Sequence, residues 1–575
     1  MKKLAACFLA ALVSLPALAG PQEASTTDDD QVAIGRRIYR EGILPSGEPL
    51  RGLGEANVTL AGDQAACATC HRRSGYGSSE GPIEVRAITG PALFGERVAP
   101  TAPGSLAAPV ALVDEAGLSA AERAHNRARV LRDARAAQFL GTRQRPAYDD
   151  TSLIRAVREG IDVTGRRMNA AMPRYALDLA SQAALTAYLK TLSAQVSPGV
   201  TDDRVHFATV IQPGSDPAQR RAILDVLQAF IQDRNLGLRA QAQREQGGAR
   251  RLGRKYRDWI LHVWDLSGPS DTWSAQLEAY YQAQPVFALM SGLGNGSWQP
   301  IHDFSEHFEV PCIFPQTDVP VLAKHDFYTV YLSRGVTLEA QALVKFLRDA
   351  GERGPVLQVF RRSEASAAGA GAFDEAWTDA AGAAPTEIVL DSDPDEAFWQ
   401  RLAEQAGGAT LVLWLSSPDL ELAQALAATG AKVKAIYLSS SLIAGPRSGL
   451  AVDATGRVRL IYPQDPPASR AGRLAVVKRW LSANGIVPAD EKVQMNAYLA
   501  ATVTGMLVTN SKDTFSREFL LERMEHRLGT ALELSIYPHL SLGPGQRYAS
   551  KGSYIVAGGG ANDRDLAPVS DWIVP

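Results

Sequence analysis

The chain has 575 residues, which is too long for one ordinary hydrophobic core and predicts about two to four domains. Hydrophobic residues make up 46% and charged residues 21%, a balance that excludes a disordered chain. The formal net charge of -3 excludes a global attraction to nucleic acid or to an anionic membrane surface, so any partner must recognise a local feature.

The N-terminus has the pattern of an export signal. Lys2-Lys3 precedes an apolar run over residues 4–15, and Ala17-Leu18-Ala19 offers a small-residue cleavage site. Residues 1–19 are therefore expected to be a signal peptide of a periplasmic protein. No later run of about 18 apolar residues occurs, so the sequence predicts no membrane span.

The first predicted element after the signal is an amphipathic helix over residues 28–40. Ile34, Ile38 and Tyr39 fall at helical spacing, and the aspartates from Asp28 onward offer N-caps. Gly35 lies on the same face as Tyr39, and a glycine there would let a second helix approach closely.

The motif Cys67-Ala68-Thr69-Cys70-His71 organises the region before residue 200. C-x-x-C-H is the spacing at which two thiols attach to the vinyl groups of a haem while the histidine reaches the iron. A redox pair or half of a zinc site would show the same cysteines, but no second C-x-x-C completes a zinc site and no βαβ pattern surrounds the motif. The sequence therefore predicts one covalent haem c, attached through Cys67 and Cys70, with His71 as an iron ligand.

Two methionines are available as a second iron ligand within residues 20–198. Asp149-Asp150-Thr151 predicts the start of a helix over residues 151–159, and Met168 and Met172 follow it. A thioether ligand holds a haem at high potential, and Pro173 would restrain the loop after Met172. If both methionines were core residues, His125 or an open iron site would remain.

The last helix of this region carries Leu185, Tyr188, Leu189 and Leu192 at helical spacing, with Ser181 as its expected cap. Residues 97–145 contain a further predicted helix. It begins at the capping box of Ser119 to Glu122 and runs to about residue 137.

The two terminal helices, the C-x-x-C-H motif, the segment 90–95 (G-P-x-L-x-G) and Met172-Pro173 together resemble the class I cytochromes c. The resemblance implies an all-α domain in which the first and last helices cross, with Met172 as the sixth ligand of the iron. It also makes the carbonyl of Pro91 the expected hydrogen-bond partner of His71, with Pro82 as the alternative. The arginines that flank these motifs are either a solvated face or a patch that binds an acidic redox partner or the haem propionates. They are Arg72, Arg73, Arg166, Arg167 and Arg174.

A change of pattern after Pro198-Gly199 predicts a domain boundary. We expect a cytochrome c domain with insertions over residues 20–198, a linker over 199–204 and a second domain over 205–575. Apolar strands alternate with helix-length amphipathic segments there, which predicts an α/β doubly wound architecture. The predicted strands are 205–211, 259–264, 285–290, 310–314, 356–360, 410–415, 433–438 and 459–462.

Three stretches of this second domain, 285–292, 310–317 and 545–554, resemble the type I periplasmic solute-binding proteins of the branched-chain amino-acid transporter class. The resemblance implies two Rossmann-like lobes that close on a small polar ligand. Each candidate cleft residue could equally be a loop residue that satisfies turn hydrogen bonds. The candidates are Ser291, Gly292, Asn295, Ser297, Trp298, Gln316, Thr317 and Tyr331.

Two further features of this half have simpler interpretations. Cys312 lies in an apolar run and is expected to be a buried free thiol. The basic run from Arg250 to Arg257 is expected to be an exposed insertion.

The sequence therefore predicts a periplasmic monohaem c-type cytochrome that transfers electrons to or from a redox partner protein, with a solute-binding-like domain for ligand sensing or docking. The alternative is an ABC-transporter-type solute receptor whose haem acts as a redox sensor. A haem enzyme would need an open iron site, against which Met172 argues, so no catalytic residue is expected.

Overall fold

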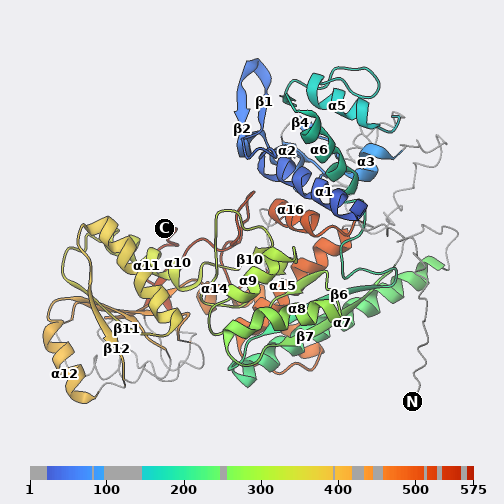
Figure 1. The fold of residues 1–575 in the computed structure, drawn as a ribbon. Coiled ribbons are helices and arrows are strands. Elements are labelled where there is room, and N and C mark those ends of the chain that lie inside the picture. Colours follow the sequence, from blue (N-terminus) through green and yellow to red (C-terminus); the bar gives the residue numbers. More distant parts are fainter. Residues whose placement is uncertain are drawn as a thin grey trace, which may run out of the picture. The chain divides into compact units, whose positions relative to one another are not determined.

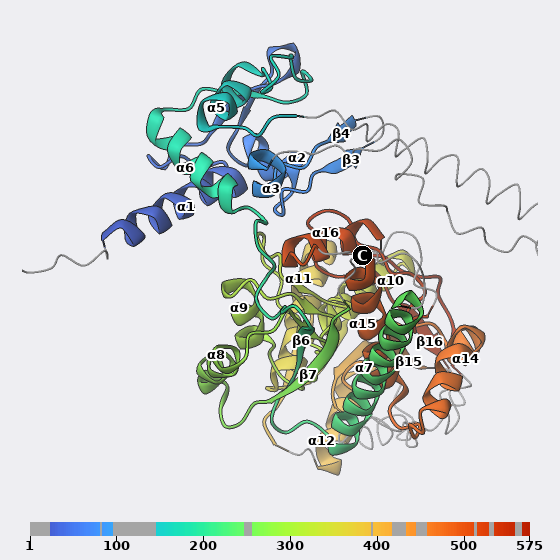
Figure 2. The same ribbon diagram turned by 90° about the vertical axis from the view of Figure 1, so that its right-hand side faces the viewer.

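The structure is a computed structural model, and the chain forms two compact units, Met1–Gln195 and Val196–Pro575 (Figures 1 and 2). The expected signal peptide, the expected helix between residues 119 and 137, His125 and most of the basic run before Arg257 lie outside the described residues. The described residues are 23–80, 83–95, 145–246, 256–392, 395–416, 433–443, 457–510, 514–527, 534–557 and 566–575.

The first unit is built mainly from helices around one hydrophobic core (Figure 1). Leucine, isoleucine and tyrosine side chains from its first, fourth and last described helices meet in that core. The helices are α1 (Glu23–Glu41), α2 (Cys67–His71), α3 (Gly90–Phe94), α5 (Asp150–Glu159) and α6 (Leu179–Thr191).

Helices α1 and α6 cross at Gly35, as expected. A Cβ atom on Gly35 would overlap the carbonyl oxygen of Ala184 on α6, so the crossing requires a glycine. The rings of Tyr39 and Tyr188 pack beside it with their centres 5.3 Å apart. Both tyrosines are buried in this contact, which joins the first and the last helix of the unit.

The helix ends depend on carboxylate caps. Helix α6 begins at Leu179 because the Asp178 carboxylate accepts from the N–H of Ser181 at 2.7 Å. Ser181, the expected cap, is instead buried inside the helix. Helix α5 agrees with its prediction, and Gly160 ends it in the left-handed conformation with φ 67°.

Short strands connect these helices, so the expectation of an all-α domain is wrong in this respect. β1 (Arg51–Leu53) pairs antiparallel with β2 (Thr59–Ala61) and with β5 (Arg174–Tyr175). β3 (Ser78–Glu80) and β4 (Ile83–Val85) form a hairpin. The long segments beside the C-x-x-C-H motif satisfy their backbone hydrogen bonds by this pairing.

The first lobe of the second unit contains a five-stranded parallel sheet in the order β10-β9-β8-β6-β7. Counted along the chain, this order is a doubly wound arrangement in which the direction of strand addition reverses between β6 and β8. The strands are β6 (Arg204–Ile211), β7 (Asp258–Asp265), β8 (Ala288–Met290), β9 (Cys312–Ile313) and β10 (Thr329–Val330).

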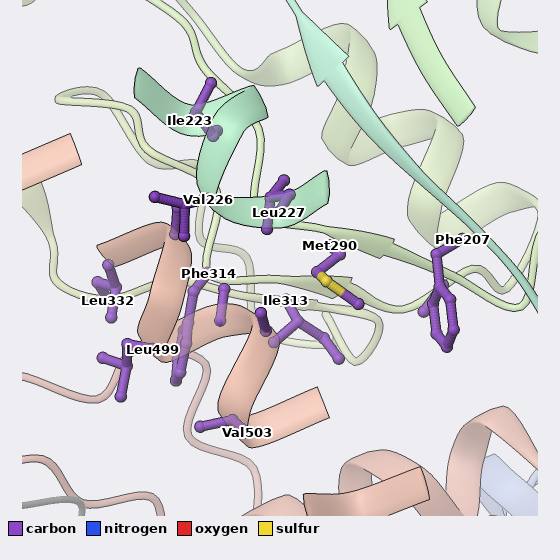
Figure 3. Close-up of a cluster of buried hydrophobic side chains, with 14 of the residues drawn as sticks. Phe207, Ile223, Val226, Leu227, Met290, Ile313, Phe314, Leu332, Leu499 and Val503 are labelled. Atoms are coloured by element: carbon purple, nitrogen blue, oxygen red, sulfur yellow. The ribbon is translucent and has the colours of Figure 1, made fainter. Parts of the chain in front are cut away.

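Helices cover both faces of this sheet because alternate residues of β6 are apolar on each side. Phe207 and Ile211 face the cluster that includes α7 (Pro217–Gln246), whereas Ala208 and Val210 face α8 (Trp273–Ala283) and α9 (Gln299–His307). Figure 3 shows the first cluster, in which Ile223, Val226 and Leu227 of α7 lie over Met290, Ile313 and Phe314.

The second lobe repeats the same strand order. Its sheet runs β12-β11-β13-β14-β15-β16-β17, with the first five strands parallel and the last two antiparallel. The strands are β11 (Val356–Arg361), β12 (Thr386–Leu390), β13 (Thr410–Trp414), β14 (Ala435–Ser439), β15 (Val458–Tyr462), β16 (Tyr554–Ala557) and β17 (Ala567–Pro568). The helices between them are α10 (Gly335–Asp349), α11 (Glu364–Ala381) and α12 (Glu396–Gln405).

Within the described residues, the chain passes between the lobes after β10, after β15 and before β16. After β15 it returns to the first lobe, where three helices complete the core around α7; Figure 3 shows Leu499 and Val503 of the second of them. These helices are α14 (Pro467–Ala483), α15 (Glu491–Asn510) and α16 (Arg517–Arg527). Because Tyr462 of β15 pairs with Tyr554 of β16, all of these crossings lie at the carboxyl ends of the parallel strands.

The expected linker over residues 199–204 belongs to the second unit instead. The N–H of Ser197 donates to the carbonyl of Phe515 at 2.7 Å, and the N–H of His206 donates to the carbonyl of Gly199 at 2.8 Å. A Cβ atom on Gly199 would overlap the backbone of Phe287. The segment is therefore packed against the lobe, and the units divide between Gln195 and Val196.

Candidate functional site

The C-x-x-C-H residues form one short helix in the first unit. Cys67 opens α2, and Cys70 and His71 end it, so both sulfurs lie toward the same side of the helix. Neither sulfur is joined in a disulfide within the described residues. Burial, reinforced by the nearby Cys70, raises the pKa of the Cys67 thiol to about 12.

His71 is oriented by a backbone carbonyl, but not by the expected one. Its Nδ1 atom lies 3.0 Å from the carbonyl oxygen of Arg86, so Nδ1 carries the proton and donates. The carbonyl of Pro91 accepts instead from the N–H of Gly95 at the end of α3. The expectation of Pro91 is therefore wrong, because the hairpin of β3 and β4 returns the chain to the histidine at Arg86.

The ring of His71 is prepared to act as a ligand through its other nitrogen. Burial lowers the pKa of His71, and the hydrogen bond to the Arg86 carbonyl opposes this only partly. A neutral imidazole with Nδ1 protonated leaves the lone pair of Nε2 for a metal.

The two candidate methionines have different surroundings. Met172 and Cys67 both pack against the core cluster of the first unit, which contains Tyr175. Met168 is not part of that cluster; its N–H donates to the carbonyl of Gly160 at 2.8 Å. Burial, followed by the charges of Cys67 and Cys70, raises the pKa of Tyr175, so this ring lies near both thiols.

The chemistry of this donor set fits a haem c. Cys67 and Met172 both pack against one core cluster, and the thiol of Cys70 and the imidazole of His71 belong to the same short helix as Cys67. Of the five flanking arginines, Arg174 donates to the carbonyl of Met172, whereas Arg166 and Arg167 are exposed in the turn that follows Asp162.

In the second unit, three of the predicted cleft residues hold the loop after β8 rather than line an open surface. Ser291 is fully buried with φ 57°, and Gln316 donates to the carbonyl of Val493 at 3.1 Å. Gly292 has φ 141°, and a Cβ atom there would lie 2.7 Å from the ring of Trp298. The backbone strain at Ser291 and Gly292 aims the following residues at the carboxyl edge of the sheet.

Asn295, Ser297 and Thr317 are the predicted residues that reach solvent at this edge. Gln212, which follows β6, organises them: its Nε2 donates to the carbonyl of Ser297 at 2.8 Å. Asn295 donates to the carbonyl of Gly214 at 2.9 Å. These contacts connect the ends of β6 and β8, where the strand order reverses.

Glu364, the first residue of α11, reaches this loop from the second lobe. Its exposed carboxylate accepts from the backbone N–H of Ser297 at 2.7 Å. The carboxyl edges of the two sheets therefore meet at Ser297 and Glu364. No sequence pattern singles out Glu364, because an acidic residue after a serine N-cap is ordinary at the start of a helix.

Trp298 and Tyr331 were expected in the cleft, and the structure contradicts this. Both belong to the buried cluster around Cys312, with exposed fractions of 0% and 1%. The Tyr331 hydroxyl lies 3.1 Å from Nδ1 of His302. Large aromatic rings fill the space below the loop, and the Tyr331 hydroxyl finds its partner inside the core. Cys312 is buried and free, as expected.

A buried carboxylate at the start of the second lobe was missed by the sequence interpretation. Glu339 of α10 is fully buried and accepts hydrogen bonds from Ser440 at 3.2 Å and from the hydroxyl of Ser441 at 2.8 Å, and also from Ser439. Burial raises the pKa of Glu339 to about 7, and the serine hydroxyls oppose this.

Charged groups of the first lobe face this carboxylate. Asp318 raises its pKa and Lys492 lowers it, and these two side chains form an ion pair with a separation of 3.3 Å. A single glutamate between Leu338 and Ala340 of an amphipathic helix gives no sequence signal for such a cluster.

Two searches of the described part of the chain gave negative results. No group of three or more His, Cys, Asp or Glu side chains there could hold a metal ion. None of the helices in those ranges has the length and apolar character needed to cross a membrane.

No protein-family model matches the chain, and no curated protein is similar to it. Among solved structures, it is similar to a fatty acid ABC transporter substrate-binding protein from Thermomonospora curvata, with 16% identity over 66% of this chain and 95% of that chain and a TM-score of 0.47. A leucine-binding protein LivK from Thermotoga maritima matches at 14% identity over 64% of this chain and 99% of its own, with a TM-score of 0.47. A branched-chain amino acid ABC transporter protein from Thermus thermophilus, solved with bound valine, matches at 13% identity over 65% of this chain and 97% of its own, with a TM-score of 0.48. These identities and TM-scores assign no ligand to the chain.

Proposed function

We propose that the chain is an exported receptor for a small polar solute, similar to the type I periplasmic receptors of ABC transporters, and that its first unit carries one covalent haem c as a redox sensor. One observation supports the receptor most strongly. Two lobes with the same doubly wound strand order meet at their carboxyl edges through Ser297 and Glu364. Ligands of such sheets bind outside the carboxyl ends of the strands, where the strand order reverses.

The residues proposed to contact the solute come from both lobes. Asn295 and the hydroxyls of Ser297 and Thr317 offer neutral hydrogen-bonding groups, and Glu364 offers a negative charge. The crossings at the same edge are suited to closure by a hinge, since a few residues there can absorb the rotation. Binding and release, rather than catalysis, is the expected activity.

Calorimetry on the full chain tests this proposal, after a thermal-shift screen of small amino acids, organic acids and amines. Thr317→Ala and Glu364→Gln should each weaken binding of the solute found by the screen about tenfold, which corresponds to the loss of roughly one hydrogen bond. Ser482→Ala, at an exposed position in the last turn of α14, is the matched control. The proposal fails if no compound stabilises the chain, or if both variants bind as tightly as the wild type.

The proposed haem would be attached through Cys67 and Cys70, with His71 as one iron ligand and Met172 as the other. A bound haem c supplies one-electron redox chemistry. The chain's own part is to fix the His71 ring through Arg86 and to exclude water with the core around Tyr175.

A simple electron carrier is the second candidate, favoured by the shared packing of Met172 and Cys67 on one core. Titration of the haem potential with and without saturating solute separates the two functions. In a sensor, the solute should shift the haem potential by about 60 mV or more, which is equivalent to a tenfold change in solute affinity between the redox states. In a simple carrier, the solute should leave the haem potential unchanged.

A further inference from the structure

Two segments that cross between the lobes bring two cations to one aromatic ring. Arg334 follows β10 in the first crossing, and Lys551 precedes β16 in the last. The segments lie side by side because Tyr331 and Tyr548 form a parallel bridge. The Lys551 Nζ lies 3.9 Å and the Arg334 Cζ 5.7 Å from the centre of the Tyr548 ring. The two charges are therefore within about 10 Å of each other, close enough for one small anion to attract both.

Neither cation has a carboxylate partner among the described residues. Arg334 donates to the amide oxygen of Gln341 at 2.8 Å, and Lys551 donates to the carbonyl of Tyr548. Both partners are neutral. Both cations are partly buried, and burial without a counter-charge lowers the pKa of Lys551 to about 8.

We propose that Arg334, Lys551 and Tyr548 form a binding site for a small anion, a phosphate or a carboxylate, on the two crossing segments. A guanidinium binds either anion through two parallel hydrogen bonds, and an ammonium adds a point charge that can follow the ligand. Such an anion would supply the missing counter-charge and would also connect two segments that must bend when the lobes move. The site uses none of the residues proposed to contact the solute.

Calorimetric titration of the full chain with inorganic phosphate, and separately with succinate, tests the site at constant ionic strength in chloride near pH 7. Lys551→Gln and Arg334→Gln should each weaken binding about tenfold or more, and Lys551→Arg should retain most of it. Lys345→Gln is the control, because Lys345 is an exposed lysine on α10 that pairs with Asp349. The affinity of Lys345→Gln for the anion should stay within about twofold of that of the wild type. The preferred titrant identifies the source, phosphate or carboxylate.

The proposal is overturned if neither anion binds at about 10 mM, since the ring of Tyr548 alone would then satisfy both cations. It is also overturned if Lys551→Gln and Arg334→Gln bind as the control does. Circular dichroism spectra of the variants ensure that a loss of binding is not a loss of folding.

Discussion

Replacing Arg517 with methionine should strongly destabilise the second unit. Arg517 is the first residue of α16, is 4% exposed and donates hydrogen bonds to neighbours from several elements. The acceptors are the carbonyls of Pro198, Val286, Phe287, Phe308 and Glu309 and the hydroxyl of Tyr281.

The magnitude follows from the acceptors left behind. Methionine fills much of the same volume but donates nothing, and a buried carbonyl without a partner costs about 1–3 kcal/mol. Water can reach some of these carbonyls, so the costs do not all add. We expect a loss of about 3–5 kcal/mol in the free energy of unfolding, because several buried hydrogen bonds of one network are lost together.

Urea denaturation followed by tryptophan fluorescence measures this loss, because all 9 tryptophans of the chain lie in the second unit. Arg220→Met is the matched control: Arg220 forms an exposed pair with Asp265 at 2.8 Å, for which less than about 1 kcal/mol is expected. If Arg517→Met lowers the free energy of unfolding no more than Arg220→Met does, the hydrogen bonds from Arg517 to the surrounding carbonyls do not stabilise the lobe and the reasoning is wrong.

The remaining predictions concern the haem and the buried glutamate. A pyridine haemochrome assay should find one covalent haem in the exported chain and none in a Cys67→Ala/Cys70→Ala double variant; haem retained by that variant would contradict the attachment. Met172→Ala should lower the potential and open the iron to exogenous ligands, whereas Met168→Ala should not, and a reversed result would exchange their roles. Because burial raises the pKa of Glu339 from 4.5 to about 7, its contribution to stability is present below the unfolded pKa and is lost as pH rises through about 7. Between pH 4.5 and 7.5, the free energy of unfolding of Glu339→Gln should therefore rise by up to about 3 kcal/mol relative to that of the wild type, as measured by urea denaturation. If the difference between the two proteins is the same at both pH values, the raised pKa of Glu339 is refuted.

The sequence predicts the central strands of both lobes well, because each is a continuous apolar run. β6 and β13 are buried along almost their whole length, and such runs have few alternatives to a sheet covered on both faces. The strands that were missed are short or at edges. β10 has two residues, and β12 exposes two of its five side chains, so neither has a distinctive pattern.

Side-chain direction within a loop is harder to predict than the loop itself. The segment after β8 was correctly expected at the carboxyl edge, yet Trp298 turns into the core while Asn295 reaches solvent. The difference arises from the backbone at Ser291 and Gly292, whose positive φ values are set by tertiary packing. Similarly, the hydrogen-bond partner of His71 depends on a hairpin of three-residue strands, which no local sequence pattern predicts.

The return of α14, α15 and α16 to the first lobe determines the order in which the unit can form. Their apolar residues complete the core around β6 and α7, although about 300 residues of chain separate β6 from α16. A nascent chain thus holds an open half-core until its last quarter emerges. Contacts of such long sequence separation slow folding and prolong the time in which the chain can aggregate. The first unit, continuous within its own segment, has no such delay.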